Sequence, residues 1–456
     1  MRRRATLLIA TSVMLLMTAA SPAAAQESAT TADEQTTTTI VRYDGPPQDG
    51  GEPVEATMLT EPTRIGPEAL VVDSKTAPVA KLPEGQEVYD DSGQNGPSSA
   101  SVAALTSGPR PVASASYGAS INATDCQEDS EAYNASGHVI DHFDYCAASY
   151  FIATFQVCTV YWWGTSCRTT GTAQWRQVSL GRGYNNSDKV TRYVDFVNLL
   201  DEWKLSGDAG THSMTIGMSC LTQVGAACEA RYAPHTQTIA QWAGPFPTTY
   251  FRFDSPSAGG FGDELIGQYD FQTTVSLVGG TSASFGANTF RCDSAPYIIN
   301  TQAGSGCVFP DVTSVFSLSV NSNATQEALH IYQAQYYPWT TTPADPNKQI
   351  PGSVDSGLPL TRNADKVEAK RNRDTAVAHC YAQYGPDYSA GNRFQCDEYP
   401  FAATHQGAFT AGTNYSARPI PARDNESGGA QLGAFYSFNR MLDGVAPDPY
   451  FVQITA

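Results

Sequence analysis

The residues best suited to chemistry lie in one short run, residues 396–408, which reads CDEYPFAATHQGA. Two adjacent carboxylates, Asp397 and Glu398, follow a cysteine and precede a Tyr-Pro pair, and His405 lies downstream. A carboxylate or an imidazole can take a proton from water, and carboxylate oxygens suit hard divalent cations. Acidic pairs also cap ordinary turns, so the surrounding elements must decide between the two interpretations.

The elements expected around this run form a strand, a loop, a second strand and a helix. Residues 364–381 carry charges of both signs and are predicted to form a mostly solvated helix upstream of the acidic strand. Residues 415–421 (YSARPIP) are predicted to form an edge strand, because prolines are excluded from central strands. The run 424–429 (DNESGG) is expected to be a turn that opens a second helix, and residues 450–454 form a last strand.

This succession is what a one-metal phosphodiesterase requires. Hydrolysis of a phosphodiester needs a base for the attacking water and a cation that polarises the phosphate. Oxygen ligands from Asp, Asn and Glu suit Mg²⁺ or Mn²⁺. Asn439 shares a helical face with Leu432 and Phe435. Its amide is therefore expected either to form a hydrogen bond with the backbone of a neighbouring strand or to face an active-site cleft. A buried amide without partners would cost about 1–3 kcal/mol.

The run CDEYPFA at 396–402, followed by Asp424-Asn425 before a helix, resembles the NucA/NucB-type secreted bacterial deoxyribonucleases. The resemblance covers roughly residues 365–456, and it implies a small, sequence-nonspecific, metal-dependent endonuclease with a ββα-metal-like site. It implies that Asp397 is the general base, with Glu398 as a second catalytic or metal-binding group. Asn425 and Asn439 would be metal ligands, while Glu426 and His405 are weaker candidates. The sequence after Asn425 departs from the family pattern, so the resemblance does not fix the ligand on the helix.

The charge distribution bears on DNA binding, which depends largely on phosphate neutralisation. The formal net charge is −18, which favours solubility and argues against a protein that coats anionic polymers along its length. Residues 361–456 hold nine Lys/Arg and ten Asp/Glu, so most of the acidic excess lies upstream. The arginines nearest the motif elements are expected to form a local basic rim for DNA: Arg393, Arg418, Arg423 and Arg440.

The N-terminal part is predicted to be a targeting segment followed by a leader. Residues 1–25 combine three arginines, a short apolar run and an Ala-Ala-Ala cleavage pattern, as in secretory signal peptides. Later segments are too polar to span a membrane, so the protein is predicted to be secreted and extracellular. Residues 26–114 are poor in apolar residues and are interpreted as a disordered leader, a prosegment or a wall-spanning spacer.

Residues 115–345 are predicted to form a β-rich, sandwich-like domain, joined by a linker at 346–362 to the nuclease domain at 363–456. The fold class is therefore α+β. Residues 149–163 are aromatic and β-branched, as strands prefer, whereas residues 190–203 also fit a helical face. Ten cysteines in an exported chain predict disulfides between near neighbours: Cys126–Cys146, Cys158–Cys167, Cys220–Cys228, Cys292–Cys307 and Cys380–Cys396.

Two alternatives to the nuclease are considered. One is a non-enzymatic cell-surface protein whose β-rich domain contacts cell wall or another polymer through aromatic groups such as Tyr161-Trp162-Trp163, although such residues are more often core. The other is a glycosidase, which is disfavoured because adjacent residues on a strand point to opposite faces. The sequence does not indicate whether an immunity protein exists.

Overall fold

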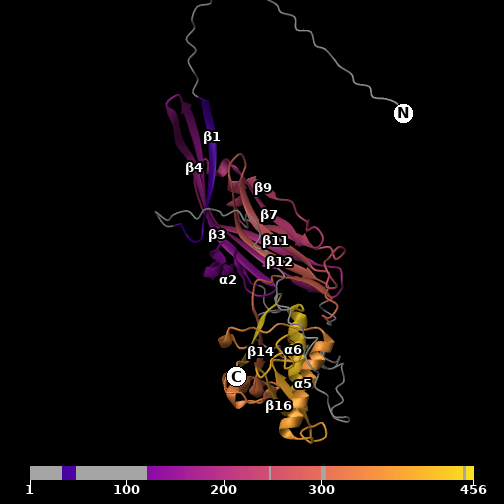
Figure 1. The fold of residues 1–456 in the computed structure, drawn as a ribbon. Helices are drawn as coiled ribbons and strands as arrows, with labels where there is room; N and C mark the ends of the chain where they lie inside the picture. The colour runs from indigo at the N-terminus through magenta and orange to yellow at the C-terminus, as the bar shows by residue number, and fades with distance from the viewer. Residues whose placement is uncertain (1–32, 48–120, 246–247, 299–303, 445–447, 456) are drawn as a thin grey trace, which may run out of the picture.

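The computed structural model describes residues 33–47, 121–245, 248–298, 304–444 and 448–455. The expected signal segment at 1–25 lies outside these residues. Figure 1 shows a β-rich part joined to a smaller part that holds helices α5 and α6. The β-rich character of the longer part was predicted from the sequence, and the structure confirms it.

The β-rich part contains two antiparallel sheets. The first sheet has, in spatial order, β1 (Asp33–Tyr43), β3 (Asp144–Tyr161), β4 (Gly164–Arg182), β6 (Tyr193–Gly207), β10 (Thr248–Asp254) and β8 (Glu229–Ala230), with β2 (His138–Val139) beside β3. The second has β5 (Tyr184–Asn186), β13 (Ser305–Val308), β12 (Ser282–Asp293), β11 (Gly267–Leu277), β7 (Ser213–Val224) and β9 (His235–Thr238). Short helices connect these strands: α2 (Ala123–Glu128), η3 (Ser130–Tyr133), η4 (Ala209–Thr211) and α3 (Ile239–Trp242).

One hydrophobic core joins the two sheets. Trp175 and Phe196 from the first sheet and Phe271 and Phe290 from the second are at most 2% exposed and belong to the same cluster. Residues 190–203, which also fitted a helical face, are a strand from Tyr193 onward, because side chains from Tyr193 to Leu200 alternate between half-buried and buried positions. That two-residue period is the period of a strand.

All five predicted disulfides are present: Cys126–Cys146, Cys158–Cys167, Cys220–Cys228, Cys292–Cys307 and Cys380–Cys396. Two of them, Cys158–Cys167 and Cys292–Cys307, join paired strands of a hairpin. Cys158 and Cys167, for example, lie directly opposite each other on β3 and β4. Such bridges stabilise mainly by restricting the unfolded chain.

The expectation of a disordered leader at 26–114 does not hold for Asp33–Tyr43, which forms β1 and pairs with β3 along its whole length. Four consecutive threonines lie in this strand. Threonine is β-branched, so this polar run is compatible with an edge strand even though it offers little apolar surface.

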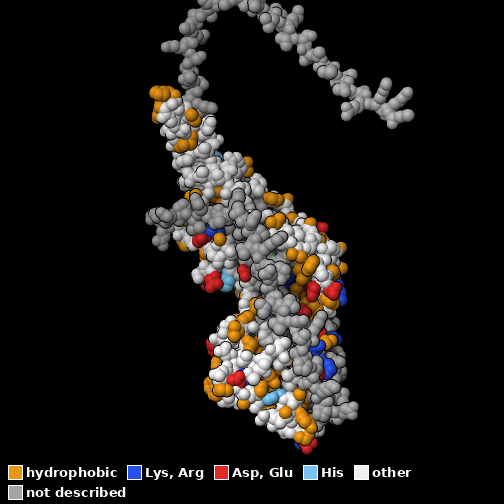
Figure 2. Space-filling view, viewed as in Figure 1, with side chains coloured by type: hydrophobic (Ala, Val, Ile, Leu, Met, Phe, Trp, Pro, Cys, Tyr) orange, Lys and Arg blue, Asp and Glu red, His pale blue; other side chains and the backbone are white. Residues whose placement is uncertain are grey.

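The tip of the β3–β4 hairpin exposes aromatic side chains that would more often be core. Trp162 is 96% exposed, and the rings of Tyr161 and Trp163 stack with centroids 4.7 Å apart. Figure 2 shows hydrophobic side chains gathered at this end of the molecule. This surface lies at the far end of the molecule from the C-terminal part.

The C-terminal part begins upstream of residue 363, because two earlier elements pack within it. Strand β14 pairs in parallel with β17, and α4 contacts α6, β15 and β16. The elements of this part are β14 (Ser314–Ser319), α4 (Thr325–Tyr336), η5 (Pro338–Thr340), η6 (Val354–Ser356), α5 (Lys366–Tyr384), β15 (Phe394–Tyr399), β16 (Ser416–Pro421), α6 (Ala422–Phe438) and β17 (Tyr450–Thr455). The expected boundary at residue 345 therefore falls after α4.

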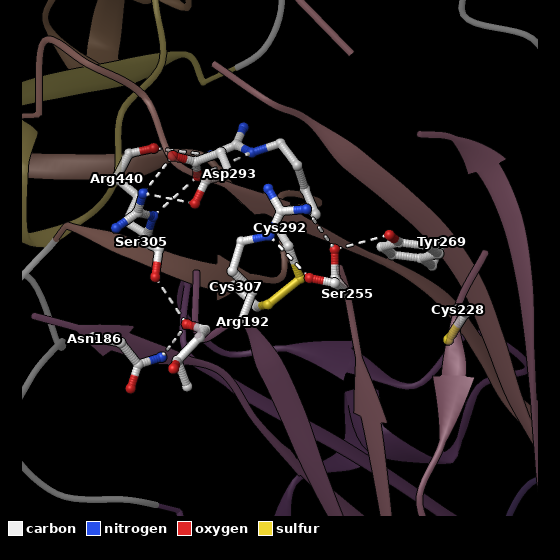
Figure 3. Close-up of a disulfide and its surroundings, with 12 residues drawn as sticks. Asn186, Arg192, Cys228, Ser255, Tyr269, Cys292, Asp293, Ser305, Cys307 and Arg440 are labelled. Atoms are coloured by element: carbon white, nitrogen blue, oxygen red, sulfur yellow. Dashed lines mark hydrogen bonds and ion pairs between the residues drawn. A yellow bond between two sulfur atoms is a disulfide. The ribbon is translucent and has the colours of Figure 1, made fainter. Parts of the chain in front are cut away.

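Buried ion pairs fasten the two parts together. Arg440, just after α6, is fully buried, and its Nε lies 2.9 Å from Oδ2 of Asp293 on β12 (Figure 3). Arg291, also on β12, lies 2.8 Å from both carboxylate oxygens of Asp448. Burial alone would raise the pKa of Asp293, but Arg440 and Arg291 outweigh it and hold this pKa below its usual value.

We expect Asp293→Asn to lower the free energy of unfolding by about 3–5 kcal/mol, because Arg440 would keep a buried charge without its partner. Denaturant titration of the variant measures the loss. The matched control is Asp254→Asn, since Asp254 pairs with Arg231 at the surface, where the Arg231 side chain is 66% exposed. That change should lower the free energy of unfolding by less than about 1 kcal/mol. Equal losses in the two variants would contradict the conclusion that the buried pair of Asp293 and Arg440 stabilises the fold.

Candidate active site

Strand β15 directs its two carboxylates to opposite faces, as alternation in a strand requires. Asp397 lies opposite Arg418 on β16, and Glu398 lies opposite Ala417. The Asp397 side chain reaches α4, whereas the Glu398 side chain reaches α5. The motif therefore supplies two separate carboxylates, and not an acid pair that faces one bond.

Asp397 is held by a histidine that the sequence analysis did not single out. Its Oδ2 lies 2.7 Å from Nδ1 of His330 on α4, and Nε2 of the same ring lies 2.7 Å from Oγ of Ser416 on β16. A carboxylate only accepts hydrogen bonds, so Nδ1 carries the hydrogen and Nε2 can accept from the serine hydroxyl. The other oxygen, Oδ1, makes no hydrogen bond within the described ranges.

The Ser416–His330–Asp397 chain has the connectivity of a hydrolase triad. Ser416 is 1% exposed and His330 is fully buried, so the serine hydroxyl is not presented to a substrate in this conformation. Triads are recognised by geometry together with access to the substrate. The chain instead orients Asp397, which is itself only 3% exposed.

Glu398 has a charge partner on the other face of the strand. Its Oε2 lies 3.0 Å from Nη1 of Arg373 on α5, and the same nitrogen donates to the carbonyl of Cys396. The Cys380–Cys396 disulfide links α5 to the residue just before Asp397. This anchoring fixes β15 against α5, which holds the strand that carries Asp397 in place.

The loop after β15 is fixed by an amide on α5. Nδ2 of Asn372 donates to the carbonyls of Ala402 and Thr404, and its Oδ1 accepts from the backbone of Phe409. In this loop His405 lies 3.2 Å from Asp443. His405 is thus paired with a carboxylate other than Asp397.

Helix α6 begins earlier than expected, so Asp424 and Asn425 lie in its first turn and not in a preceding turn. Asp424 accepts from the backbone of Gln326 at the start of α4. Nδ2 of Asn425 donates to Oε1 of Gln395, two residues before Asp397, and Glu426 accepts from the same glutamine. The structure therefore brings Asn425 and Glu426 to the strand that carries Asp397.

Asn439 and Arg440 do not join this group. Asn439 caps the far end of α6, where its amide donates to the carbonyl of Phe435 and its own carbonyl lies 2.6 Å from Nδ1 of His142. It lies roughly 20 Å along the helix from Asn425, so the two cannot bind one cation. Arg440 is buried against Asp293 and is not available to DNA, whereas Arg393 and Arg423 are exposed. Arg418 is half-buried and donates to Gln333.

Glu327 on α4 is the second residue that the sequence analysis missed. It is 2% exposed, and its Oε2 has no hydrogen-bond partner within the described ranges. Burial is the main cause that raises the pKa of this carboxyl well above its usual range. The carboxylates at positions 397, 398 and 424 raise the pKa further, and Arg373 lowers it.

Glycine at position 428 is what lets Glu327 lie against α6. A Cβ atom added at Gly428 would overlap the Glu327 carboxyl, whereas one added at the next glycine, Gly429, would meet nothing within 4 Å. The signal in the sequence was the Glu-x-x-His spacing of Glu327 and His330, which places both residues on one face of a helix. It was missed because this segment was assigned to the β-rich domain.

Within the described ranges, no three His, Cys, Asp or Glu side chains form a ready-made metal site. The donors that fit a hard cation are separate carboxylate and amide oxygens, of which Oε2 of Glu327 is buried without a partner. Mg²⁺ in proteins is commonly held by one or two carboxylates, with water and substrate phosphate completing its shell. The chemistry of these donors therefore suits such an ion.

Comparison with known proteins identifies the class of the C-terminal part. Residues 353–446 match the family model Deoxyribonuclease NucA/NucB, as the resemblance predicted. This match covers α5, β15, β16 and α6, and it begins after α4. No curated protein and no solved structure matches the chain. None of the described helices is long and apolar enough to cross a membrane.

We expect Gly428→Ala to lower the free energy of unfolding by about 1–3 kcal/mol, because the added methyl group displaces a carboxyl that has no solvent space to enter. Gly429→Ala is the control and should stabilise the helix by about 0.5–1 kcal/mol, since alanine loses less backbone entropy than glycine. Thermal and denaturant unfolding measure both changes. Similar effects of the two substitutions would show that Glu327 does not occupy the space beside Gly428.

Proposed function

We propose that the protein is a secreted, metal-dependent, sequence-nonspecific endodeoxyribonuclease with Asp397 as its general base. The observation that carries the proposal is the NucA/NucB match over residues 353–446, in which strand β15 carries Asp397. The succession of β15, β16 and α6 supports a ββα-metal-like arrangement. Five disulfides support export to an oxidising environment.

The residues around Asp397 suit a base that acts on water. His330 holds one carboxylate oxygen, and the other has no partner within the described ranges and is the proton acceptor. A bound Mg²⁺ or Mn²⁺ would polarise the phosphate and stabilise the leaving oxygen. Glu398 is paired with Arg373 on the opposite face, so its role is to fix the strand. Arg393 and Arg423 are exposed and would contact DNA phosphates.

The glycosidase alternative is weakened by the opposite directions of Asp397 and Glu398, because glycosidases place two carboxyls on either side of one bond. The binding-protein alternative has one observation in its favour, the exposed aromatic tip at Trp162. Contact of this tip with cell wall or another polymer would be an additional role of the β-rich domain. It is compatible with a nuclease in the C-terminal part.

A plasmid-nicking assay with the full disulfide-bonded chain tests the nuclease. We expect nicking in Mg²⁺ or Mn²⁺, none in EDTA, and a loss of about 10²–10⁴-fold in Asp397→Asn, since the amide cannot take a proton. Asp387→Asn, a change at an exposed acid in the same part, is the control. Nicking that survives in Asp397→Asn but not in EDTA would remove the base assignment. Absence of nicking under all conditions would remove the nuclease.

We expect His330 to affect the rate of DNA cleavage by orienting Asp397. His330→Ala should lower kcat by more than about tenfold with little change in KM, because the base loses its orientation while DNA contacts remain. His330→Gln retains an N–H that can donate to Asp397 and should recover part of kcat. If the two variants were equally impaired, the hydrogen bond to Asp397 would not be the reason for the effect.

A further inference from the structure

The candidate site extends beyond the segment that matches the nuclease family. Helix α4 lies upstream of residue 353 and directs both Glu327 and His330 toward β15 and α6. His330 has a hydrogen-bond partner on each ring nitrogen. Glu327 differs, because one of its buried carboxyl oxygens has no partner within the described ranges.

Charges around Glu327 are unbalanced. Three other carboxyl groups, those of Asp397, Glu398 and Asp424, lie near enough to act on it, against one stabilising arginine, Arg373. That arginine is already paired with Glu398. A buried carboxyl without a partner is costly, and nearby negative charges raise that cost. A bound cation would offset both costs.

We infer that Glu327 is a ligand for one hard divalent cation, Mg²⁺ or Mn²⁺, at the junction of α4 and the first turns of α6. The inference rests on the proposed function for its role in DNA cleavage, but the binding itself does not require that function. Asp424 and Asn425 lie in the first turn of α6, and Gly428, one turn further, leaves the space that the Glu327 carboxyl occupies. Water would complete the shell of the ion.

This assignment changes the ligand set that the sequence suggested. Asn439 lies at the other end of α6, and Glu398 faces α5. Glu327 lies outside the family match, so the family pattern could not supply it. The site therefore requires a residue from α4, and residues 353–446 alone would lack it.

Binding of Mn²⁺ to the DNA-free, full-length, disulfide-bonded protein tests the inference by calorimetry and by the Mn²⁺-induced rise in Tm. We expect one site in the unmodified chain and an affinity lower by about tenfold or more in Glu327→Gln. Asp387→Asn removes an exposed carboxylate from the same part and should bind like the unmodified chain. In EDTA, Glu327→Gln should melt at the same or a higher temperature, which a purely structural glutamate would not allow.

Gly428→Ala provides a second variant without a change of charge, with Gly429→Ala as its control. The first should weaken Mn²⁺ binding and the second should not, because only Gly428 contacts the Glu327 carboxyl. Unchanged Mn²⁺ affinity in Glu327→Gln, or no site in the unmodified chain, would overturn the inference.

Parallel nicking assays separate this inference from the proposed function. A chain that nicks DNA while Glu327→Gln keeps its Mn²⁺ affinity would disprove the ligand and retain the nuclease. A chain that binds Mn²⁺ through Glu327 without nicking DNA would disprove the nuclease and retain the site.

Discussion

Burial of the Asp397 carboxylate is the constraint on which the C-terminal part depends. A charged group removed from water must be compensated by hydrogen bonds or opposite charge. Here the compensation comes from His330, which is itself satisfied only because Ser416 lies behind it. The strand pair and α4 are therefore fixed relative to each other by one chain of hydrogen bonds. The charge of Glu398 is compensated separately, by Arg373 on the other face of the same strand.

The β-rich part helps to hold the candidate site in place through its contacts with α6. The end of that helix is held by contacts from three β-rich segments: His142 to the carbonyl of Asn439, Asn185 to the carbonyl of Phe438, and Asp293 to Arg440. Its beginning carries Asn425 and contacts β15. One helix thus connects the interface between the two parts with the candidate site. The β-rich part supports the position of the site, and none of its described residues belongs to the site.

Local patterns predicted the elements closest to the motif, namely the helix at 364–381, both strands and the last strand, because proline positions and periodicity act over short distances. Local patterns did not predict features that depend on contacts between segments far apart in the sequence. Asn439 was a candidate because it shares a helical face with Leu432 and Phe435, and Arg440 because it lies near the motif elements in the sequence. Only the contacts of Asn439 with His142 and of Arg440 with Asp293 show that both face the β-rich part. The Glu-x-x-His spacing places His330 and Glu327 on one helical face, but no local pattern shows that this face of α4 lies against β15. The threonine-rich β1 was taken for a leader because its partner, β3, lies about a hundred residues away in the chain.

The bridge between Cys380 and Cys396 makes the order around Asp397 depend on the redox state of the surroundings. It is the covalent tether between α5 and the residue beside Asp397. In a compartment rich in glutathione the two sulfurs would remain thiols, and the strand would depend on noncovalent packing alone. Reduction of this bridge would therefore leave Asp397 on a strand that is held less firmly against α5.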